Sequence, residues 1–327
     1  MLRNEACEKH YAGKAAVQSL EAAYESEEIV RQREVTVGLL DLKRGEIVLD
    51  IGCGVGQLTT MLAALVGDAG RAVGVDTSAA MIERAEEKWR LREPIHIVNG
   101  VEVAKGEATA ALGAATAATR ADSAAAHSGE PYGVIEYQVA SAAHLPFPDD
   151  TFDAITCVQV LCYIQKAQAA AVVAEMNRVL KKPSGRLLIL DTDWDTRVLH
   201  SSDEARTRRM FAIADSLYGF ADLHIPRKIP TFAKDAGLAV ASVQGFTLVQ
   251  AGSFSPGSYF DVVGWVDAYL ADGASSTDDD SSSDEAISWS AEQRKLSNDN
   301  EFFYSCTRTI FLLTPSTRSR LGDWGYQ

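Results

Sequence analysis

The sequence predicts an α/β fold in which a mostly parallel sheet carries helices on both faces. Short apolar runs, typical of buried strands, alternate with segments whose apolar residues recur at helical spacing. We expect strands near 47–51, 71–76, 134–139, 152–158 and 186–192, and helices near 57–67, 78–92 and 166–181. The N-terminal stretch before the first strand also has a helical pattern.

A glycine-rich turn follows the first predicted strand. The strand ends in Asp50, and Gly52, Gly54 and Gly56 come at alternate positions before a helix begins. Glycine has no Cβ, so the backbone of this turn can approach a ligand closely. A dinucleotide-binding turn requires glycine where this chain has Gln57. The carboxylate of Asp50 would accept a hydrogen bond from an ammonium group and repel a pyrophosphate. The turn therefore favours S-adenosylmethionine (SAM), with a nicotinamide dinucleotide as the alternative.

A second acid, Asp76, ends the next predicted strand. An acid about 20 residues after such a turn is placed to hold the ribose hydroxyls of a nucleoside. Ser78 is suited to cap the helix that follows. An ordinary turn or cap role for Asp76 is the alternative, but the glycine turn before it favours ribose binding.

Three segments together resemble a known enzyme family: D-x-G-x-G-x-G at 50–56, the stretch 140–153 and the stretch 175–190. With them the chain resembles class I SAM-dependent methyltransferases, in the branch similar to the ubiquinone/menaquinone-biosynthesis methyltransferases. The resemblance covers roughly residues 30–195. It implies a Rossmann-like sheet of seven mostly parallel strands, of which the last is antiparallel.

The same resemblance implies how the rest of the chain is organised. Two further strands are expected near 238–250 and 301–314, and a helix near 256–271. Residues 1–46 should form an N-terminal helical cap, and residues 47–327 the methyltransferase domain.

The cofactor site that we expect combines the turn with the ends of four strands. Ser141 stands where the family usually has an aspartate that accepts from the adenine amine, and its hydroxyl is a weaker acceptor. The backbone N–H of Ala142 is still placed to meet the adenine ring. The complete set of expected cofactor-binding residues is Asp50, Gly52, Cys53, Gly54, Gly56, Asp76, Thr77, Met81, Ser141, Ala142, Val158 and Gln159.

The methyl acceptor should bind beyond the carboxyl end of the fifth strand, where Trp194 lies between two acids. Trp194 is our first candidate for acceptor contact, and packing against a helix is the alternative. Asp193 and His224 are candidates for a base or an orienting group, because histidine titrates near neutral pH. Tyr218 is a further candidate for contact with the substrate. The resemblance adds Tyr11 as another substrate candidate, because an N-terminal tyrosine closes over the cofactor in similar enzymes.

The reaction we expect is in-line methyl transfer to a small molecule, with the protein aligning the nucleophile, methyl group and sulfur. The acceptor atom stays open. A quinone-type carbon acceptor follows from the resemblance alone, and a sulfonium-forming S-methylation of a methylthio acid is the alternative. A SAM-binding protein without catalysis is the alternative from another class.

Composition excludes several function classes. The 31 basic residues stand against 45 acidic ones, and the net charge of −14 opposes binding to nucleic acid. No apolar run approaches the ~18 residues of a membrane span, and residues 1–14 lack the apolar core of a signal peptide, so we expect a cytoplasmic protein. Five scattered cysteines without a C-x-x-C pair indicate neither a metal site nor disulfides. Oligomeric state is not indicated.

Two low-complexity insertions interrupt the pattern near 101–132 and 273–286. The first is rich in alanine, glycine, threonine and serine, and the second contains an acidic run at 275–285. Neither has enough large apolar residues to offset the entropy of ordering, so we expect both to be flexible.

Overall fold

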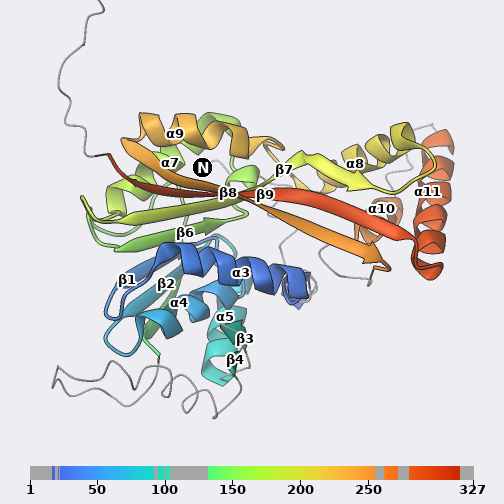
Figure 1. Cartoon of the computed structure of the whole chain (residues 1–327). Coiled ribbons are helices and arrows are strands. Elements are labelled where there is room, and N and C mark those ends of the chain that lie inside the picture. Colours follow the sequence, from blue (N-terminus) through green and yellow to red (C-terminus); the bar gives the residue numbers. More distant parts are fainter. Residues whose placement is uncertain are drawn as a thin grey trace, which may run out of the picture.

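A seven-stranded sheet forms the centre of the molecule (Figure 1). It contains β1 (Ile47–Ile51), β2 (Arg71–Asp76), β5 (Val134–Val139), β6 (Ala154–Val158), β7 (Arg186–Leu199), β8 (Leu238–Gly252) and β9 (Phe302–Pro315). The strands lie in the order β5-β2-β1-β6-β7-β9-β8. The first five of these pair in parallel, whereas β9 runs antiparallel to both β7 and β8. The predicted seven-stranded, mostly parallel sheet with an antiparallel last strand is confirmed.

The computed structural model describes residues 17, 18, 21, 23–91, 95–98, 101–103, 132–254, 261–271 and 280–316. The helices are α3 (Glu27–Leu40), α4 (Gln57–Val66), α5 (Ala79–Leu91), α7 (Lys166–Val179), α8 (Glu204–Tyr218), α9 (Ile229–Asp235), α10 (Val262–Ala271) and α11 (Asp280–Asn298), with short 3-10 turns η2 (Leu161–Tyr163) and η3 (Ile225–Lys228). β3 (Ile95–Val98) and β4 (Val101–Val103) form a separate antiparallel pair. Among the described residues, no helix is both long and apolar enough to cross a membrane.

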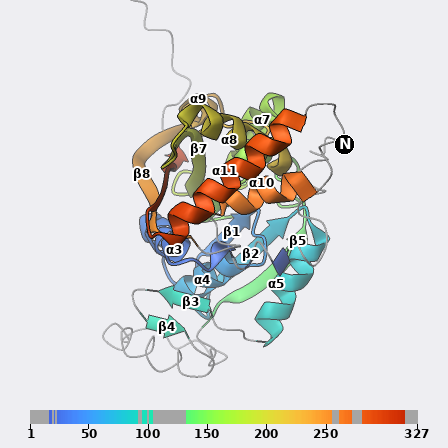
Figure 2. The ribbon, with the colours of Figure 1, turned by 90° about the vertical axis from the view of Figure 1, so that its right-hand side faces the viewer.

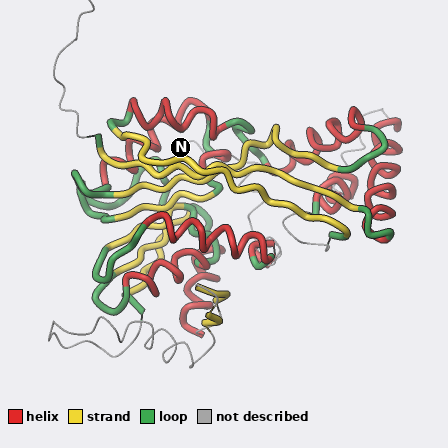
Figure 3. Tube along the Cα trace, viewed as in Figure 1, coloured by secondary structure: helices red, strands yellow, loops and turns green. Residues whose placement is uncertain are grey.

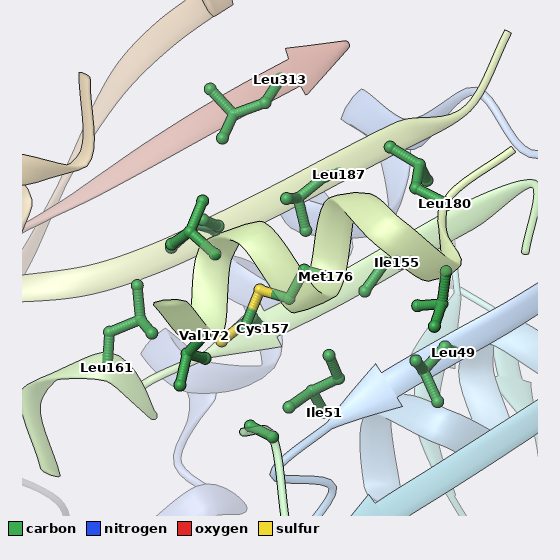
Figure 4. Close-up of a cluster of buried hydrophobic side chains, with 14 of the residues drawn as sticks. Leu49, Ile51, Ile155, Cys157, Leu161, Val172, Met176, Leu180, Leu187 and Leu313 are labelled. Carbon is green, nitrogen blue, oxygen red and sulfur yellow. The ribbon is translucent and has the colours of Figure 1, made fainter. Parts of the chain in front are cut away.

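Helices lie on both faces of the sheet (Figure 3), and apolar residues fill the space between the helices and the strands. On one face, Val172 and Met176 of α7 pack against Ile155 and Leu187 (Figure 4). On the other face, a second cluster joins α3 and α4 to the strands through Val37, Leu40, Met61, Leu62, Leu188 and Leu190. β1, β2, β6 and the first half of β7 are buried from both sides, which explains their continuous apolar runs, whereas the edge strand β5 is largely exposed.

The three C-terminal strands of the sheet extend beyond the others as an arm. β7, β8 and β9 have 14, 15 and 14 residues, and α8, α10 and α11 gather at the far end of this arm, seen end-on in Figure 2. A third apolar cluster fills the space between them, with Trp194, Met210, Leu248, Val266, Trp289 and Tyr304 as members. We expected residues 191–195 to follow the fifth strand, but they lie inside β7, because pairing with β9 continues to Leu199.

The acidic run at 275–285 also differs from the prediction. Residues 280–285 begin α11 rather than lying in a flexible insertion; residues 275–279 lie outside the described part of the chain. Acidic residues favour a helix N-terminus, and Arg209 of α8 donates to Glu285 at 3.0 Å. Ala286 and Trp289 are then fully buried against α8 and α10. In the first insertion, Val101–Val103 forms a strand, and residues 104–131 lie outside the described residues.

The packing of α11 yields a stability prediction. Trp289 is fully buried and its indole N–H donates to the Thr207 hydroxyl at 3.0 Å, so Trp289→Ala should lower the free energy of unfolding by about 3–5 kcal/mol. Ile287 lies on the same helix with 56% of its surface exposed, and Ile287→Ala should change stability by less than about 0.5 kcal/mol. Denaturant unfolding measures both, and equal effects would show that α11 does not belong to the folded core.

Candidate active site

The glycine turn connects β1 to α4 at the carboxyl edge of the sheet. Gly52 and Gly56 have positive φ angles of 69° and 82°, which side-chain-bearing residues rarely adopt. A Cβ on Gly52 would lie 2.2 Å from Val160 Cγ2, and one on Gly56 would lie 2.3 Å from Tyr137 Oη. The turn therefore presents bare backbone, and Tyr137 on β5 packs beneath it. The sequence analysis missed Tyr137, because no local pattern shows which strand lies beside β2.

Asp76 joins the turn to the end of β2. Its carboxylate accepts from the Gly54 backbone N–H at 3.0 Å and from the Ser78 backbone N–H at 2.8 Å. Burial raises the pKa of Asp76, and these N–H donors oppose the shift. The backbone N–H of Thr77 also lowers this pKa, and a carboxylate has about four lone-pair sites, so acceptor capacity remains for a ribose hydroxyl. Thr77, directly after Asp76, is exposed.

Asp50 lies under the turn rather than at its surface, with 2% of its area exposed. Its two carboxylate oxygens accept from the hydroxyls of Thr59 at 2.7 Å and Thr156 at 2.8 Å. Burial raises the pKa of Asp50 to about 6, opposed by these two hydroxyls, and the charge of Asp76 adds to the shift. Asp50 thus ties β1 to α4 and β6. We predicted a contact with a cofactor ammonium, but the two threonines, which the sequence analysis missed, engage both oxygens.

The other predicted cofactor residues come from the ends of neighbouring strands. After β5, the Ala140 N–H donates to the Asp76 carbonyl at 2.9 Å, and Ser141 and Ala142 follow in a turn closed by a bridge between Ser141 and His144. β6 ends at Val158, and Gln159 follows it. Gln159 has a positive φ of 56°, and its side-chain oxygen accepts a hydrogen bond from the Thr192 hydroxyl at 2.8 Å. The structure therefore brings the predicted residues of β5, β2, β1 and β6 to one edge.

The N-terminal segment lies against this edge. Val17 forms a small buried cluster with Val55 of the turn and Met81 of α5. Glu21 accepts from Arg84 at 3.0 Å and also pairs with Lys88, both on α5. Burial raises the pKa of Glu21, but hydrogen bonds from the two cations outweigh it, and the pKa is lowered. The segment is thus held by apolar and ionic contacts beside the turn. Tyr11 lies outside the described residues.

The cysteines of the described residues, Cys53, Cys157, Cys162 and Cys306, are buried free thiols. Burial first, and then the charges of Asp50 and Asp76, raise the pKa of Cys53 well above its usual range. Burial also raises the pKa of Cys157 and Cys306. Cys53 is therefore a small neutral filler of the glycine turn. Among the described residues, no three histidine, cysteine or acidic side chains gather in a way that would hold a metal ion.

A row of aromatic rings begins next to the end of β6. Tyr163 of η2 stacks on Phe220 with ring centroids 5.1 Å apart, and Phe220 lies 4.7 Å from Trp194. Trp194 is 2% exposed, and its indole nitrogen has no hydrogen-bond partner in the described structure. The Arg197 guanidinium lies 5.3 Å from the Trp194 ring and forms two 2.7 Å hydrogen bonds with Asp215. Tyr163 was not among the predicted site residues.

Asp193 and His224 do not join Trp194. Arg227 donates to both carboxylate oxygens of Asp193, at 2.7 and 2.8 Å, and His224 Nε2 lies 2.8 Å from Asp195 Oδ2. Trp194 is buried and Asp193 is half-buried, at the point where the pairing of β7 with β9 becomes irregular. Asp193 and His224 therefore belong to an ionic cluster at η3. The side chain of Tyr218, at the end of α8, lies outside the described structure.

Comparisons with known proteins agree with this geometry. A family model described as a methyltransferase domain matches residues 24–243. The ubiquinone/menaquinone biosynthesis C-methyltransferase UbiE of Cronobacter sakazakii is 30% identical over 206 residues, which cover 63% of this chain and 61% of the relative. UbiE of an Enterobacter species is 32% identical over 159 residues, covering 49% and 47%. The chain thus matches about half to three fifths of the length of these relatives.

Solved structures share the fold. A putative methyltransferase from Bacillus halodurans has a TM-score of 0.54 at 14% identity, covering 88% of this chain and all of that one. A phosphoethanolamine N-methyltransferase from Haemonchus contortus, solved with S-adenosylhomocysteine, has a TM-score of 0.53 at 15% identity, covering 97% of this chain and 61% of that one. Since the family model matches more than half of its length, the chain belongs to the methyltransferase domain family.

Proposed function

We propose that this protein transfers the methyl group of SAM to a small, ring-bearing acceptor held beside Trp194, Phe220 and Tyr163. The observation that carries the proposal is the hydrogen bond between Asp76 and the Gly54 backbone, which places a carboxylate against the bare glycine turn. The aromatic row begins at η2, directly after β6, whose end also borders the turn. Donor and acceptor sites are therefore neighbours.

The charges at the turn suit SAM better than a dinucleotide. Asp50 and Asp76 place two carboxylates near the same five-residue turn, and SAM carries a positive sulfonium and a positive ammonium. A pyrophosphate would meet like charge there, and the position that needs glycine for close helix packing is Gln57, the first residue of α4. We infer that Asp76 binds the ribose and that Asp50 fixes the turn and contributes its negative field.

Catalysis requires mainly alignment and the exclusion of water. SAM, when bound, supplies an electrophilic methyl group, so the chain needs no covalent intermediate. Alignment of the reactants contributes up to about 7–11 kcal/mol in favourable cases. The N-terminal segment, held by Val17 and Glu21, would cover the donor. The assignment of residues 1–46 as a cap and the cytoplasmic location stay predictions.

The aromatic row supports a ring-bearing acceptor over a methylthio acid. An acid would need a cation, but Arg197, which lies over Trp194, is already paired with Asp215, and Arg227 is paired with Asp193. The names of the UbiE relatives add support for carbon methylation. Purified protein incubated with labelled SAM and a panel of quinols, phenols, amines and thioethers tests the proposal. Transfer to thioether acids alone would favour the alternative, and SAM binding without any transfer would indicate a non-catalytic protein.

Asp76→Ala should weaken SAM binding at least about ten-fold, because a hydrogen bond to a charged group contributes roughly 1.5–3 kcal/mol. Isothermal titration calorimetry measures the affinity. Asp149→Ala is the control, since the Asp149 side chain is 72% exposed and its ion pair with Arg178 lies outside the site. Equal affinities of Asp76→Ala and the control would contradict ribose binding by Asp76.

Asp50 should make SAM affinity depend on pH. Its pKa is about 6, so the carboxylate is ionised above neutral pH and protonated in mild acid. Affinity should therefore be constant above neutral pH and fall as the pH drops through about 6, because one of two attractive charges is lost. Asp50→Asn keeps hydrogen-bonding groups for Thr59 and Thr156 without titrating. Its affinity should be lower and should fall less steeply over this range, because Asp76 alone remains to titrate, and an equally steep fall would contradict the role of Asp50.

Trp194→Phe should lower kcat/KM for the acceptor about two- to ten-fold, the effect of losing one neutral hydrogen bond, while SAM affinity stays unchanged. The ring is retained, so the packing against Phe220 persists. Trp89→Phe on α5 removes an indole N–H outside the aromatic row and serves as the control. Wild-type kinetics for Trp194→Phe in the identified transfer reaction would remove the indole N–H from the acceptor site.

A further inference from the structure

The edge strand β8 has unusual composition for its position. It is last in the sheet order, so one side of its backbone is unpaired in the described structure (Figure 1). Its 15 residues include no charged residue and no proline. Natural edge strands usually carry lysine, proline or short lengths that prevent pairing with another chain. The opposite edge, β5, has six residues and carries Glu136, which pairs with Arg71 at 3.5 Å.

Apolar side chains on this edge face solvent. Val243 and Val249 of β8 are 52% and 44% exposed. The pairing register sets Val249 beside Ser305 of β9 and Ser305 beside Val198 of β7, and Val198 is 56% exposed. Phe303, opposite Ala251, is 38% exposed. The uncharged edge thus continues into an apolar strip across the arm, a feature that marks interaction sites.

We propose that β8 pairs antiparallel with β8 of a second copy of this chain, so that the two sheets become one across a two-fold axis. A two-fold interface brings the same patch from both chains together, so it must be complementary to itself. An uncharged strand meets this condition, because no like charges face each other on pairing. The net charge of −14 on each chain opposes contacts between acidic surfaces of two copies, and an uncharged strand avoids this repulsion.

The sheet order keeps this interface away from the cofactor site. Three strands, β6, β7 and β9, lie between β1, which carries the glycine turn, and β8. Pairing through 243–252 also avoids the irregular register between Val240 and Ser242. Both copies therefore keep an open turn, and disrupting the dimer should leave SAM affinity unchanged. This separates the proposal from the proposed function, whose failure would not affect it.

Light scattering coupled to size exclusion tests the proposal over a dilution series. The wild-type chain should have twice the 35.3 kDa mass of one chain, whereas Val249→Lys and Thr247→Lys should shift to a single-chain mass. Val134→Lys is the matched control, because Val134 is 57% exposed on β5, the other edge of the same sheet, and it should stay a dimer. Circular dichroism and SAM titration check that every variant is folded.

Three results would overturn the proposal. A wild-type chain that has a single-chain mass at every concentration has no such interface. A dimer that persists in both lysine variants uses another surface. A mass that grows beyond two chains indicates open-ended association, which a two-fold pairing of β8 excludes.

Discussion

The contact between the Asp76 carboxylate and the Gly54 backbone N–H is the interaction on which the donor site depends. It fixes the glycine turn of one strand to the end of the next, together with the backbone N–H groups of Gly52 and Cys53, which donate to the Val75 carbonyl of β2 at 2.8 and 3.0 Å. Asp50 holds the turn from below, because its carboxylate accepts hydrogen bonds from threonine hydroxyls on α4 and β6. The two acids that hold the turn in place are the same two that we propose attract the positive charges of the cofactor.

The long arm links this donor site to the rest of the molecule. Thr192 of β7 donates to Gln159 at the end of β6, and Arg308, which is fully buried, lies opposite Thr192 in β9. Arg308 in turn donates to Gln32 of α3, whose amide donates to Thr36 at 2.9 Å. Buried polar groups therefore extend from the donor edge through β7 and β9 to the N-terminal helix. Buried polar networks of this kind fix one arrangement of a core, because unpaired members cost free energy.

Much of this fold could be predicted from the sequence. Apolar runs predict the parallel strands, and the glycine turn with its acids predicts the position that we propose for the cofactor, because both signals are local. The length of β7 could not be predicted, since its second half is a strand through pairing with β9. The helix α11 was missed because its acidic start is stabilised by contact with α8, which lies far away in the sequence. Thr59, Thr156 and Tyr163 have no local signal, as their roles come from the strands that they meet in space.

The central claim is that Asp76 holds the ribose of a sulfonium nucleoside at the glycine turn. A crystal structure of the protein with S-adenosylhomocysteine tests this claim most directly. The account predicts both ribose hydroxyls within hydrogen-bonding distance of the Asp76 carboxylate, and the amino-acid part lying along residues 52–56. A nucleoside bound elsewhere, or a ribose without contact to Asp76, would contradict it.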